Sequence, residues 1–235
     1  MKKEITFSPS DSRDYYFNEI EQVDMNLPGE LRRAPYKVRC QWFSSQCVAF
    51  ACTSAMTMQE KLSFDRGETN VEPHLFSPGV VYANRAEDDY QGEGWYIRKA
   101  LKQMHNYGVC LEQDFSCPEP YKTERRKFLA DKEHLLALMS QYKVRVYFRC
   151  QTENEIKTTI AHYGSVIVSA YIPTFLKSKL TKKDWAKRDK HAFIITGWDA
   201  QGWICQDSYS IFRPWFGQFH LSYDYPIEEF WGIIL

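Results

Sequence analysis

The sequence predicts an α+β protein in which a mainly helical part is followed by a part built from strands. Apolar residues recur at helical spacing between residues 47 and 142, and short β-branched or aromatic runs dominate from residue 144 onward. The chain has 235 residues, of which 44% are hydrophobic and 16% aromatic, which is enough for a substantial core. Helices first and strands second favour two unlike lobes.

The first half contains three predicted helices after a polar N-terminal segment, residues 1–39, in which Pro and Gly break any long helix. The first helix covers 47–62, because apolar residues stand at i, i+3, i+4 and i+7 and neither Gly nor Pro interrupts it. Ser44 and Ser45 are good N-cap types, which puts Cys47 in the first turn. A second helix begins near 92–94 and stops at Gly108. A third covers 124–142, with Leu129, Leu135, Leu136 and Met139 pointing inward.

The second half is predicted to contain six strands and one helix. The strands cover 144–148, 166–171, 191–198, 203–206, 219–223 and 230–235, and the helix covers 153–162. We therefore divide the chain into an N-terminal segment (1–39) that packs on the lobes, a helical lobe (40–125) and a β-rich lobe (126–235).

Charge excludes several classes of partner. Lys and Arg together number 30, as do Asp and Glu, so the net charge is zero and there is no general electrostatic reason to bind nucleic acid or an anionic membrane. The start of the chain lacks a secretory signal, and no segment approaches the roughly 18 apolar residues of a membrane span. We expect a soluble cytoplasmic protein. One local exception is the run from Lys177 to Lys190, with a charge of +5. Such a run is usually a solvated loop, and because this one leads into His191, an acidic substrate or partner is kept as the alternative hypothesis.

One of the seven cysteines is placed to do chemistry. The sequence has no C-x-x-C motif, so no metal or other cofactor is expected, and without a secretion signal each cysteine is expected to be a thiol. Cys47 stands in the first turn of a buried helix, where unpaired N–H groups and the macrodipole favour a thiolate. We interpret the others as structural thiols: Cys40, Cys52, Cys110, Cys117, Cys150 and Cys205.

A thiolate nucleophile needs an imidazole partner, and His191 is the best candidate. His191 begins one predicted strand and Asp207 follows the next, so the turn at 199–202 brings them side by side. A carboxylate there fixes the tautomer and stabilises imidazolium. The remaining histidines have no such partner in the predicted arrangement and are given packing or surface roles: His74, His105, His134, His162 and His220.

Acyl transfer also needs donors for the developing oxyanion. The backbone N–H of Cys47 supplies one. A Gln or Asn side chain commonly supplies the second, and both Gln41, six residues upstream, and Gln46, directly adjacent, are candidates.

The order and spacing of these residues resemble those of the papain-like cysteine peptidases. His191 and Asp207 stand 144 and 160 residues after Cys47. The resemblance selects Gln41 over Gln46 for the oxyanion. It extends to 207–209, which is similar to the family's Asn-Ser-Trp segment, to 76–82, similar to its Leu-Ser-Pro segment, and to 107–109, similar to its Tyr-Gly-Val segment. It implies substrate-binding roles for Gly92, Gly94, Tyr209 and Trp215.

This resemblance implies a two-lobed papain-like fold, with Cys47 on the helical lobe and His191 and Asp207 on the β lobe. The implied activity is hydrolysis of a peptide or protein substrate through a thioester, by a Cys-His-Asp triad. Two departures from the family pattern stand out. Ser44 replaces a half-cystine, and Asp207 replaces the commoner Asn. Only 46 residues precede Cys47, so we expect a microbial or viral type without the long inhibitory prodomain.

Other functions share this order of residues. Bacteriocin-leader peptidases, transglutaminases and cell-wall amidases also use a Cys-His-Asp arrangement, and an inactive papain-like binding module is a further alternative. The Gln41 position, the Ser-Pro segment and the long Cys-to-His interval favour the papain group. Double-glycine leader peptides, γ-glutamyl donors and muropeptides would separate the enzymatic alternatives.

Overall fold

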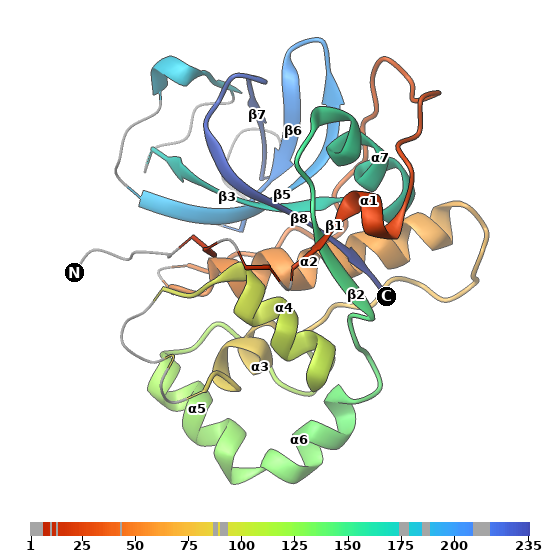
Figure 1. Cartoon of the computed structure of the whole chain (residues 1–235). Helices are drawn as coiled ribbons and strands as arrows, with labels where there is room; N and C mark the ends of the chain where they lie inside the picture. The colour runs from red at the N-terminus through yellow and green to blue at the C-terminus, as the bar shows by residue number, and fades with distance from the viewer. Residues whose placement is uncertain are drawn as a thin grey trace.

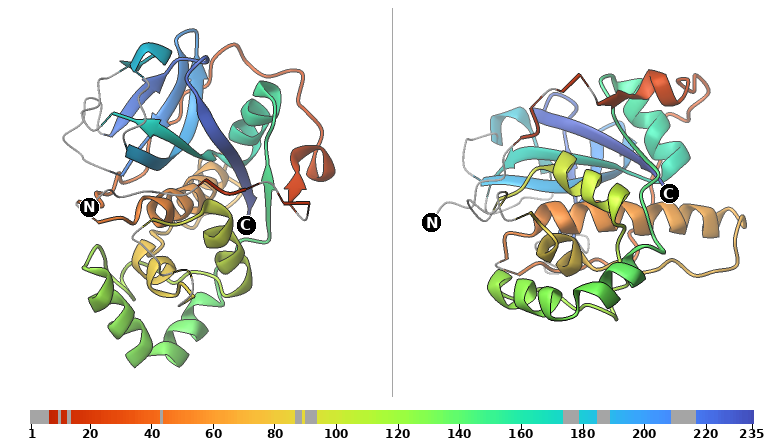
Figure 2. Two further views of the ribbon diagram at one scale, coloured as in Figure 1. Left: turned by 60° about the vertical axis from the view of Figure 1, so that its left-hand side comes forward. Right: turned by 60° about the horizontal axis from the view of Figure 1, so that its bottom comes forward.

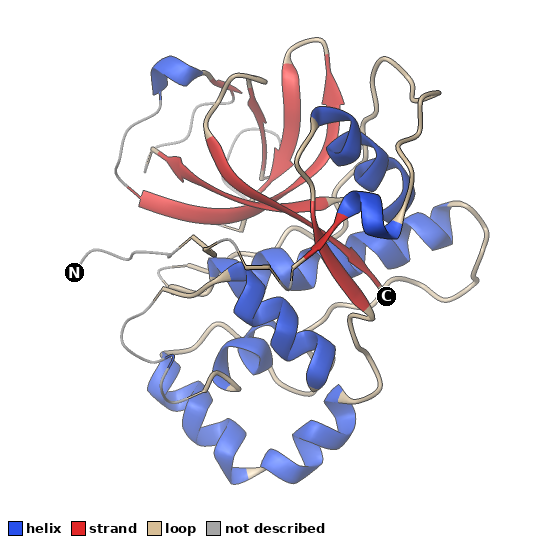
Figure 3. Cartoon of the chain, in the orientation of Figure 1, coloured by secondary structure: helices blue, strands red, loops and turns tan. Residues whose placement is uncertain are grey.

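The molecule has two parts, one built around a mixed sheet and the other mainly from helices (Figure 3). The computed structural model describes residues 7–9, 11–12, 14–42, 44–86, 89, 94–173, 179–184, 189–208 and 217–235. Its α+β character is as predicted.

The helices of the described residues cluster mainly in the first 140 residues. Their bounds are α1 (Phe17–Ile20), α2 (Cys47–Asp65), α3 (Pro78–Ala83), α4 (Ile97–Asn106), α5 (Tyr121–Ala130), α6 (Lys132–Met139) and α7 (Glu153–Tyr163), with a short 3₁₀ turn, η2 (Lys182–Asp184). The long helix predicted from residue 47 therefore begins where expected. Helix α7 begins with a capping box, because Thr152 accepts from the Glu155 N–H and the Glu155 carboxylate returns to the Thr152 N–H.

The strands form one sheet in the order β1-β2-β8-β3-β5-β6-β7-β4. Their bounds are β1 (Tyr15–Tyr16), β2 (Val146–Arg149), β3 (Val166–Ile172), β4 (Lys179–Leu180), β5 (Asp189–Asp199), β6 (Gly202–Gln206), β7 (Gln218–Leu221) and β8 (Ile227–Ile234). The pairs β1/β2 and β4/β7 are parallel, and the others are antiparallel. All six predicted strands are present within a few residues of their expected bounds.

Helix α2 lies between the two parts and packs against β5. It runs along the underside of the sheet in Figure 1 and in the right-hand view of Figure 2. Its sequence explains this position, because apolar and small residues surround the helix on nearly every side and twelve of its residues are buried. A second buried cluster fills the β lobe around Phe193, Trp198 and Phe219.

The N-terminal segment is tied to both parts of the molecule. The buried Asp14 carboxylate accepts from Arg98 Nε of α4 at 2.6 Å and from Arg149 Nε of β2 at 2.8 Å. Farther along, Leu31 and Trp198 exchange backbone hydrogen bonds of 2.9 and 2.8 Å. The segment also contains two short elements that the sequence did not predict, β1 and α1.

The prediction of one continuous helix over 124–142 is wrong, because this region forms two helices, α5 and α6. Asp131, with φ −130° and ψ 34°, separates α5 from α6, and the two meet at an angle at the lower end of Figure 1. The break changes which residues face inward. Leu135 and Met139 are buried as predicted, whereas Leu129 is 50% exposed.

The expected N-cap of α2 is also wrong. Gln46 occupies this position, and its side chain makes no capping hydrogen bond to the helix. The predicted stop at Gly108 is correct, since Gly108 follows α4 with φ +85° and a Cβ there would lie 1.9 Å from the Met139 carbonyl oxygen. No helix in the described part of the chain has the length and apolar character needed to cross a membrane.

Candidate active site

Cys47 is the first residue of α2 and is buried. The chain holds all seven cysteines as thiols. Burial raises the pKa of Cys110, Cys117 and Cys150 to about 12, and it raises the pKa of Cys52 and Cys205 as well. These five thiols are therefore protonated near neutral pH, which removes them as thiolate nucleophiles.

The Cys47 backbone N–H lies in the first turn of α2, where the intrahelical hydrogen bonds have not yet begun. The Gln46 carbonyl accepts the first intrahelical hydrogen bond, from the Phe50 N–H at 2.9 Å. The N–H groups of the first turn have no partner within the helix, and the helix dipole adds partial positive charge there. This end of α2 is therefore suited to a thiolate and to a developing oxyanion.

Gln41 is fixed by two contacts with Ser208, the residue after Asp207. The Gln41 backbone N–H donates to the Ser208 carbonyl oxygen at 2.6 Å, and the Ser208 hydroxyl donates to Gln41 Oε1 at 2.6 Å. Because Oε1 accepts, the amide nitrogen is the donor end, and Nε2 donates to the Ser44 carbonyl oxygen at 2.7 Å. A side-chain amide carries two N–H groups, so the second suits an oxyanion.

The strand register puts His191 and Asp207 on one face of the sheet. Ile194 pairs with Gln206 in the antiparallel β5/β6 ladder, so Asp207 falls on the face that carries Phe193 and His191. The rings of His191 and Phe193 are stacked with centroids 6.0 Å apart, as expected for residues on the same face. Both His191 and Asp207 are buried, and the Asp207 N–H donates to the Gly217 carbonyl oxygen at 3.0 Å.

Two connections relate the cysteine side of the site to the histidine side. Helix α2 packs against β5, and both elements begin on the left of the molecule in Figure 1. The Gln41–Ser208 hydrogen bonds join the loop before Cys47 to the end of β6. The sequence did not single out Ser208 for this role, since its partner lies 167 residues away.

The expectation that five histidines lack a carboxylate partner is wrong for three of them. His74 lies 3.0 Å from Glu60, His162 lies 2.6 Å from Glu21, and His220 lies 3.0 Å from Asp199. Their side chains are 25–34% exposed, whereas His191 is 0% exposed. His105 contacts the Val144 carbonyl, and His134 is exposed. A carboxylate neighbour alone therefore does not distinguish His191.

Gln46 is turned toward the helical lobe, which leaves Gln41 as the oxyanion candidate. Its Nε2 lies 2.9 and 2.8 Å from the two carboxylate oxygens of Glu124 and 3.4 Å from the Glu119 carbonyl oxygen. Glu124, on α5, is fully buried and was not predicted to matter. A lone Glu in an amphipathic helix gives no sequence signal of burial.

Comparison with known proteins agrees with this arrangement at the level of the fold. No family model matches the chain, and no curated protein matches its sequence. Among solved structures, xylellain, a cysteine protease from Xylella fastidiosa, superposes with a TM-score of 0.80 at 18% identity, over 99% of this chain and 96% of that one. Procathepsin L 3 from Tenebrio molitor gives 0.64 at 14% identity, over 95% of this chain and 74% of that one. The chain has the papain-like fold.

A further papain-like structure, Cwp84 from Clostridium difficile, includes a lectin-like domain. It superposes with a TM-score of 0.73 at 15% identity, covering 97% of this chain and 54% of that chain. The shared part corresponds to nearly the whole of the present chain. Xylellain and procathepsin L 3 match over 95% or more of the chain as well, so the papain-like fold accounts for both the helical and the β-rich part.

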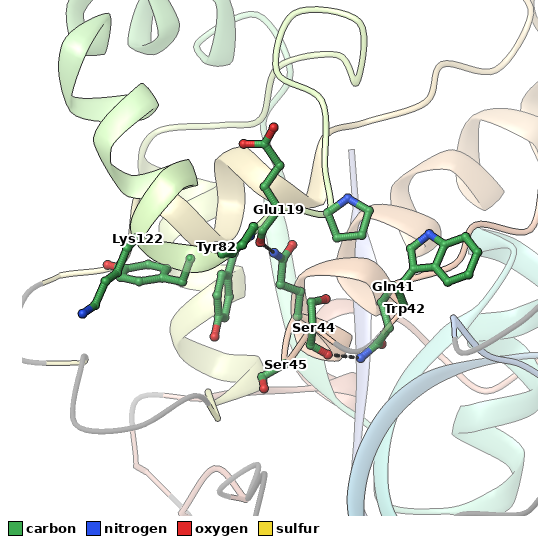
Figure 4. A pocket seen from close by; sticks show the side chains of 11 residues that line it. Gln41, Trp42, Ser44, Ser45, Tyr82, Glu119 and Lys122 are labelled. Atoms are coloured by element: carbon green, nitrogen blue, oxygen red, sulfur yellow. Dashed lines mark hydrogen bonds between the residues drawn. The ribbon is translucent and has the colours of Figure 1, made fainter. Parts of the chain in front are cut away.

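A pocket of about 640 Å³ opens beside the start of α2 in this papain-like fold (Figure 4). Its walls are largely apolar and its charged groups are Glu119 and Lys122. Trp42, on one side, is 60% exposed and has φ +50°, a left-handed conformation that is uncommon for a bulky residue. The lining residues are Gln41, Trp42, Ser44, Ser45, Gln46, Tyr82, Pro118, Glu119, Pro120, Tyr121 and Lys122.

The predicted substrate-binding residues lie mostly outside the described part of the chain. Gly92, Tyr209 and Trp215 are in this group. Gly94 is described, and its carbonyl oxygen accepts from Arg85 Nη2 at 2.8 Å. Its role in binding substrate stays a prediction.

The basic run from Lys177 to Lys190 is described in part. Lys182 and Lys183 are exposed on η2, while 177, 187 and 188 lie outside the described residues. An acidic partner at this run stays a prediction. No three or more His, Cys, Asp or Glu side chains gather into a metal-binding group within the described ranges.

Proposed function

We propose that this protein is a cysteine peptidase that hydrolyses peptide bonds with Cys47, His191 and Asp207, and with Gln41 at the oxyanion. The observation that carries the proposal is the pair of hydrogen bonds between Gln41 and Ser208. They fix the Gln41 amide between the loop that precedes Cys47 and the end of β6, which leads to Asp207. The papain-like fold of the chain supports it, because two of its structural neighbours, xylellain and Cwp84, are described as cysteine proteases.

In the acylation step, the Cys47 thiolate attacks the carbonyl carbon of the substrate amide. A C–S bond forms and the carbonyl π electrons move to oxygen, where the Cys47 N–H and a Gln41 Nε2–H donate to the oxyanion. As the intermediate collapses, the C–N bond breaks and the His191 imidazolium gives its proton to the departing amine. Asp207 orients the imidazole and stabilises its charged form. The products are a free amine and a thioester on Cys47.

In the deacylation step, neutral His191 takes a proton from a water molecule that attacks the thioester carbonyl. The same two donors bind the second oxyanion, and its collapse breaks the C–S bond. The carboxylic acid product leaves, and Cys47 returns as a thiolate beside imidazolium. No metal or organic cofactor takes part in these steps.

The test is cleavage of a peptide library, scored by mass spectrometry, with the wild-type chain and two cysteine variants. Cys47→Ala is expected to fold and to cleave nothing. Cys52→Ala is the matched control, because Cys52 lies on the same helix and its thiol is buried in the core. Undiminished cleavage by Cys47→Ala would refute the proposal.

The same assay separates the enzymatic alternatives. Double-glycine leader peptides, γ-glutamyl donors with an amine acceptor, and muropeptides are offered alongside ordinary peptides. Turnover of ordinary peptides supports the proposed function, whereas turnover of one special class alone would replace it. A wild-type chain that binds peptides without cleaving them would indicate a binding module.

A further inference from the structure

We propose that Glu124 is a positioning residue for the reaction at Cys47, and that it acts by holding the peptide unit between Gln46 and Cys47. The inference rests on the proposed peptidase function. It concerns a buried carboxylate on α5 that the mechanism above does not use, and whose hydrogen bonds lead to the residue immediately before the nucleophile.

The Glu124 carboxylate joins Glu119, in the segment before α5, to Gln46 at the start of α2. Glu124 Oε1 accepts from the Glu119 backbone N–H at 2.8 Å. Both carboxylate oxygens accept from Gln46 Nε2, at 2.9 and 2.8 Å. Hydrogen bonds to an ionised acceptor are stronger than neutral ones, and inside a protein they are weakly screened. The Gln46 side chain is thereby fixed to a different helix from the one it begins.

Fixing Gln46 also fixes the Cys47 N–H, because the two share a peptide unit. The Gln46 carbonyl and the Cys47 N–H lie in one plane. The carbonyl is held by the Phe50 N–H at 2.9 Å, and the side chain is held by Glu124. With both ends of Gln46 anchored, rotation of this plane is restricted. The direction of the proposed oxyanion donor therefore depends on Glu124.

The surroundings make this carboxylate sensitive to pH. Burial raises its pKa to about 7, although hydrogen bonds from the Glu119 N–H and Gln46 lower it. The charged side chains acting on it are those of Glu119, which raises the pKa, and Lys127, which lowers it. Cys117 is a protonated thiol beside it. Helix α3 packs against α5 and brings Tyr82 next to Tyr121, with ring centroids 5.5 Å apart.

The experiment compares Glu124→Ala, Gln46→Ala and the double variant with the wild type. Each single variant is expected to lower kcat about tenfold while KM stays within about twofold, because a misplaced oxyanion donor acts on the transition state. The double variant should lose no more than either single one. Glu124→Gln keeps the shape of the side chain and one acceptor oxygen, so its kcat should be close to that of the wild type. Any part of the pH dependence of kcat that comes from titration of Glu124 should be absent from this variant. Glu133→Ala, on the exposed face of α6, is the control.

Two ligands test the inference without turnover. The Cys47 thiolate adds to a peptide aldehyde: a C–S bond forms, the carbonyl π electrons move to oxygen beside the proposed donors, and this oxygen takes the proton of the His191 imidazolium to give a hemithioacetal. Glu124→Ala should weaken this binding about tenfold. Iodoacetamide reacts with the thiolate and needs no oxyanion donor, so its rate should stay unchanged.

Unchanged kcat in both single variants, or losses that multiply in the double variant, would overturn the role of Glu124. If Glu124→Ala does not fold, Gln46→Ala and the pH profile of Glu124→Gln decide the question. A wild-type chain that neither cleaves peptides nor binds the aldehyde would overturn the proposed function and this inference together. An active wild type with unaffected variants would overturn this inference alone.

Discussion

Gln41 and Ser208 are joined twice, through the backbone and through their side chains, with both hydrogen bonds at 2.6 Å. The pair spans 167 residues and connects the loop before Cys47 to the end of β6. Because both residues are buried, the bonds are shielded from water and hold Gln41 in one orientation. The proposed oxyanion donor is thus positioned by the strand that also leads to Asp207.

Ser208→Ala should weaken catalysis and stability together. The variant leaves Gln41 Oε1 buried without its donor, which costs about 2 kcal/mol of unfolding free energy. It also releases the amide, so kcat should fall about tenfold with a small change in KM. Urea unfolding and steady-state kinetics measure the two effects. Ser222→Ala removes an exposed hydroxyl that donates to Asp224, and should change neither.

Asp207 should tolerate loss of its charge better than loss of its side chain. Asp207→Asn keeps a group of the same shape that can accept the imidazole N–H, so kcat/KM should fall about tenfold or less. Asp207→Ala removes the group that orients His191 and should lower kcat/KM about 100-fold. Steady-state kinetics on one peptide substrate makes the comparison. Equal activity of the wild type and Asp207→Ala would show that Asp207 does not orient the imidazole.

Trp42 should govern affinity for substrates with a bulky apolar side chain. Its ring lines the 640 Å³ pocket beside Cys47 with Tyr82 and Tyr121. Trp42→Gly should raise KM about tenfold for such substrates. It should also relieve a left-handed conformation that costs a non-glycine residue about 1 kcal/mol, so the Tm should not fall.

A matched control for the pocket is Val71→Ala, which truncates an apolar side chain that is 58% exposed and does not line the pocket. An unchanged KM in Trp42→Gly for all library peptides would mean that the pocket binds no part of the substrate.

Glu124 should make stability depend on pH in a defined direction. Its pKa in the folded chain is about 7, above the ordinary value of 4.5. A raised pKa means that the folded state binds the proton more tightly, so this contribution is complete below pH 4.5 and is lost as the pH rises through 7. The loss relative to Glu124→Gln is on the order of 3 kcal/mol. Urea unfolding of the wild type and of Glu124→Gln across this pH range measures the loss. If the unfolding free energies of the two proteins change with pH in parallel, the raised pKa of Glu124 is contradicted.

The sequence predicted local features well and long-range contacts poorly. The start of α2 at Cys47 and the β5 and β6 strands followed from apolar periodicity, which depends on neighbours within a few residues. The break at Asp131 was missed because the apolar pattern continues through it, with Leu129 before and Leu135 after. The expected Ser caps failed for a similar reason, since Gln46 is held at the helix start by Glu124 on α5.

The candidate site shows the same division. Cys47, His191 and Asp207 were identified from residue type, order and spacing, whereas Gln41 was selected over Gln46 by the resemblance to the papain-like family. The roles of all four stay predictions. Ser208 was not assigned a role and Glu124 was not noticed, because their partners lie 167 and 78 residues away. The histidine–carboxylate pairs at His74, His162 and His220 were missed because their partners stand 14, 141 and 21 residues away, beyond any local pattern.

The most direct test of the proposed nucleophile is to locate the site of covalent modification while activity is followed. A thiol-directed epoxide is added in small steps, and after each step peptide cleavage is measured and the modified cysteine is mapped by mass spectrometry. We predict that modification appears on Cys47 and that activity falls in proportion to it. Full modification of Cys47 with activity retained, or loss of activity that follows another cysteine, would contradict it.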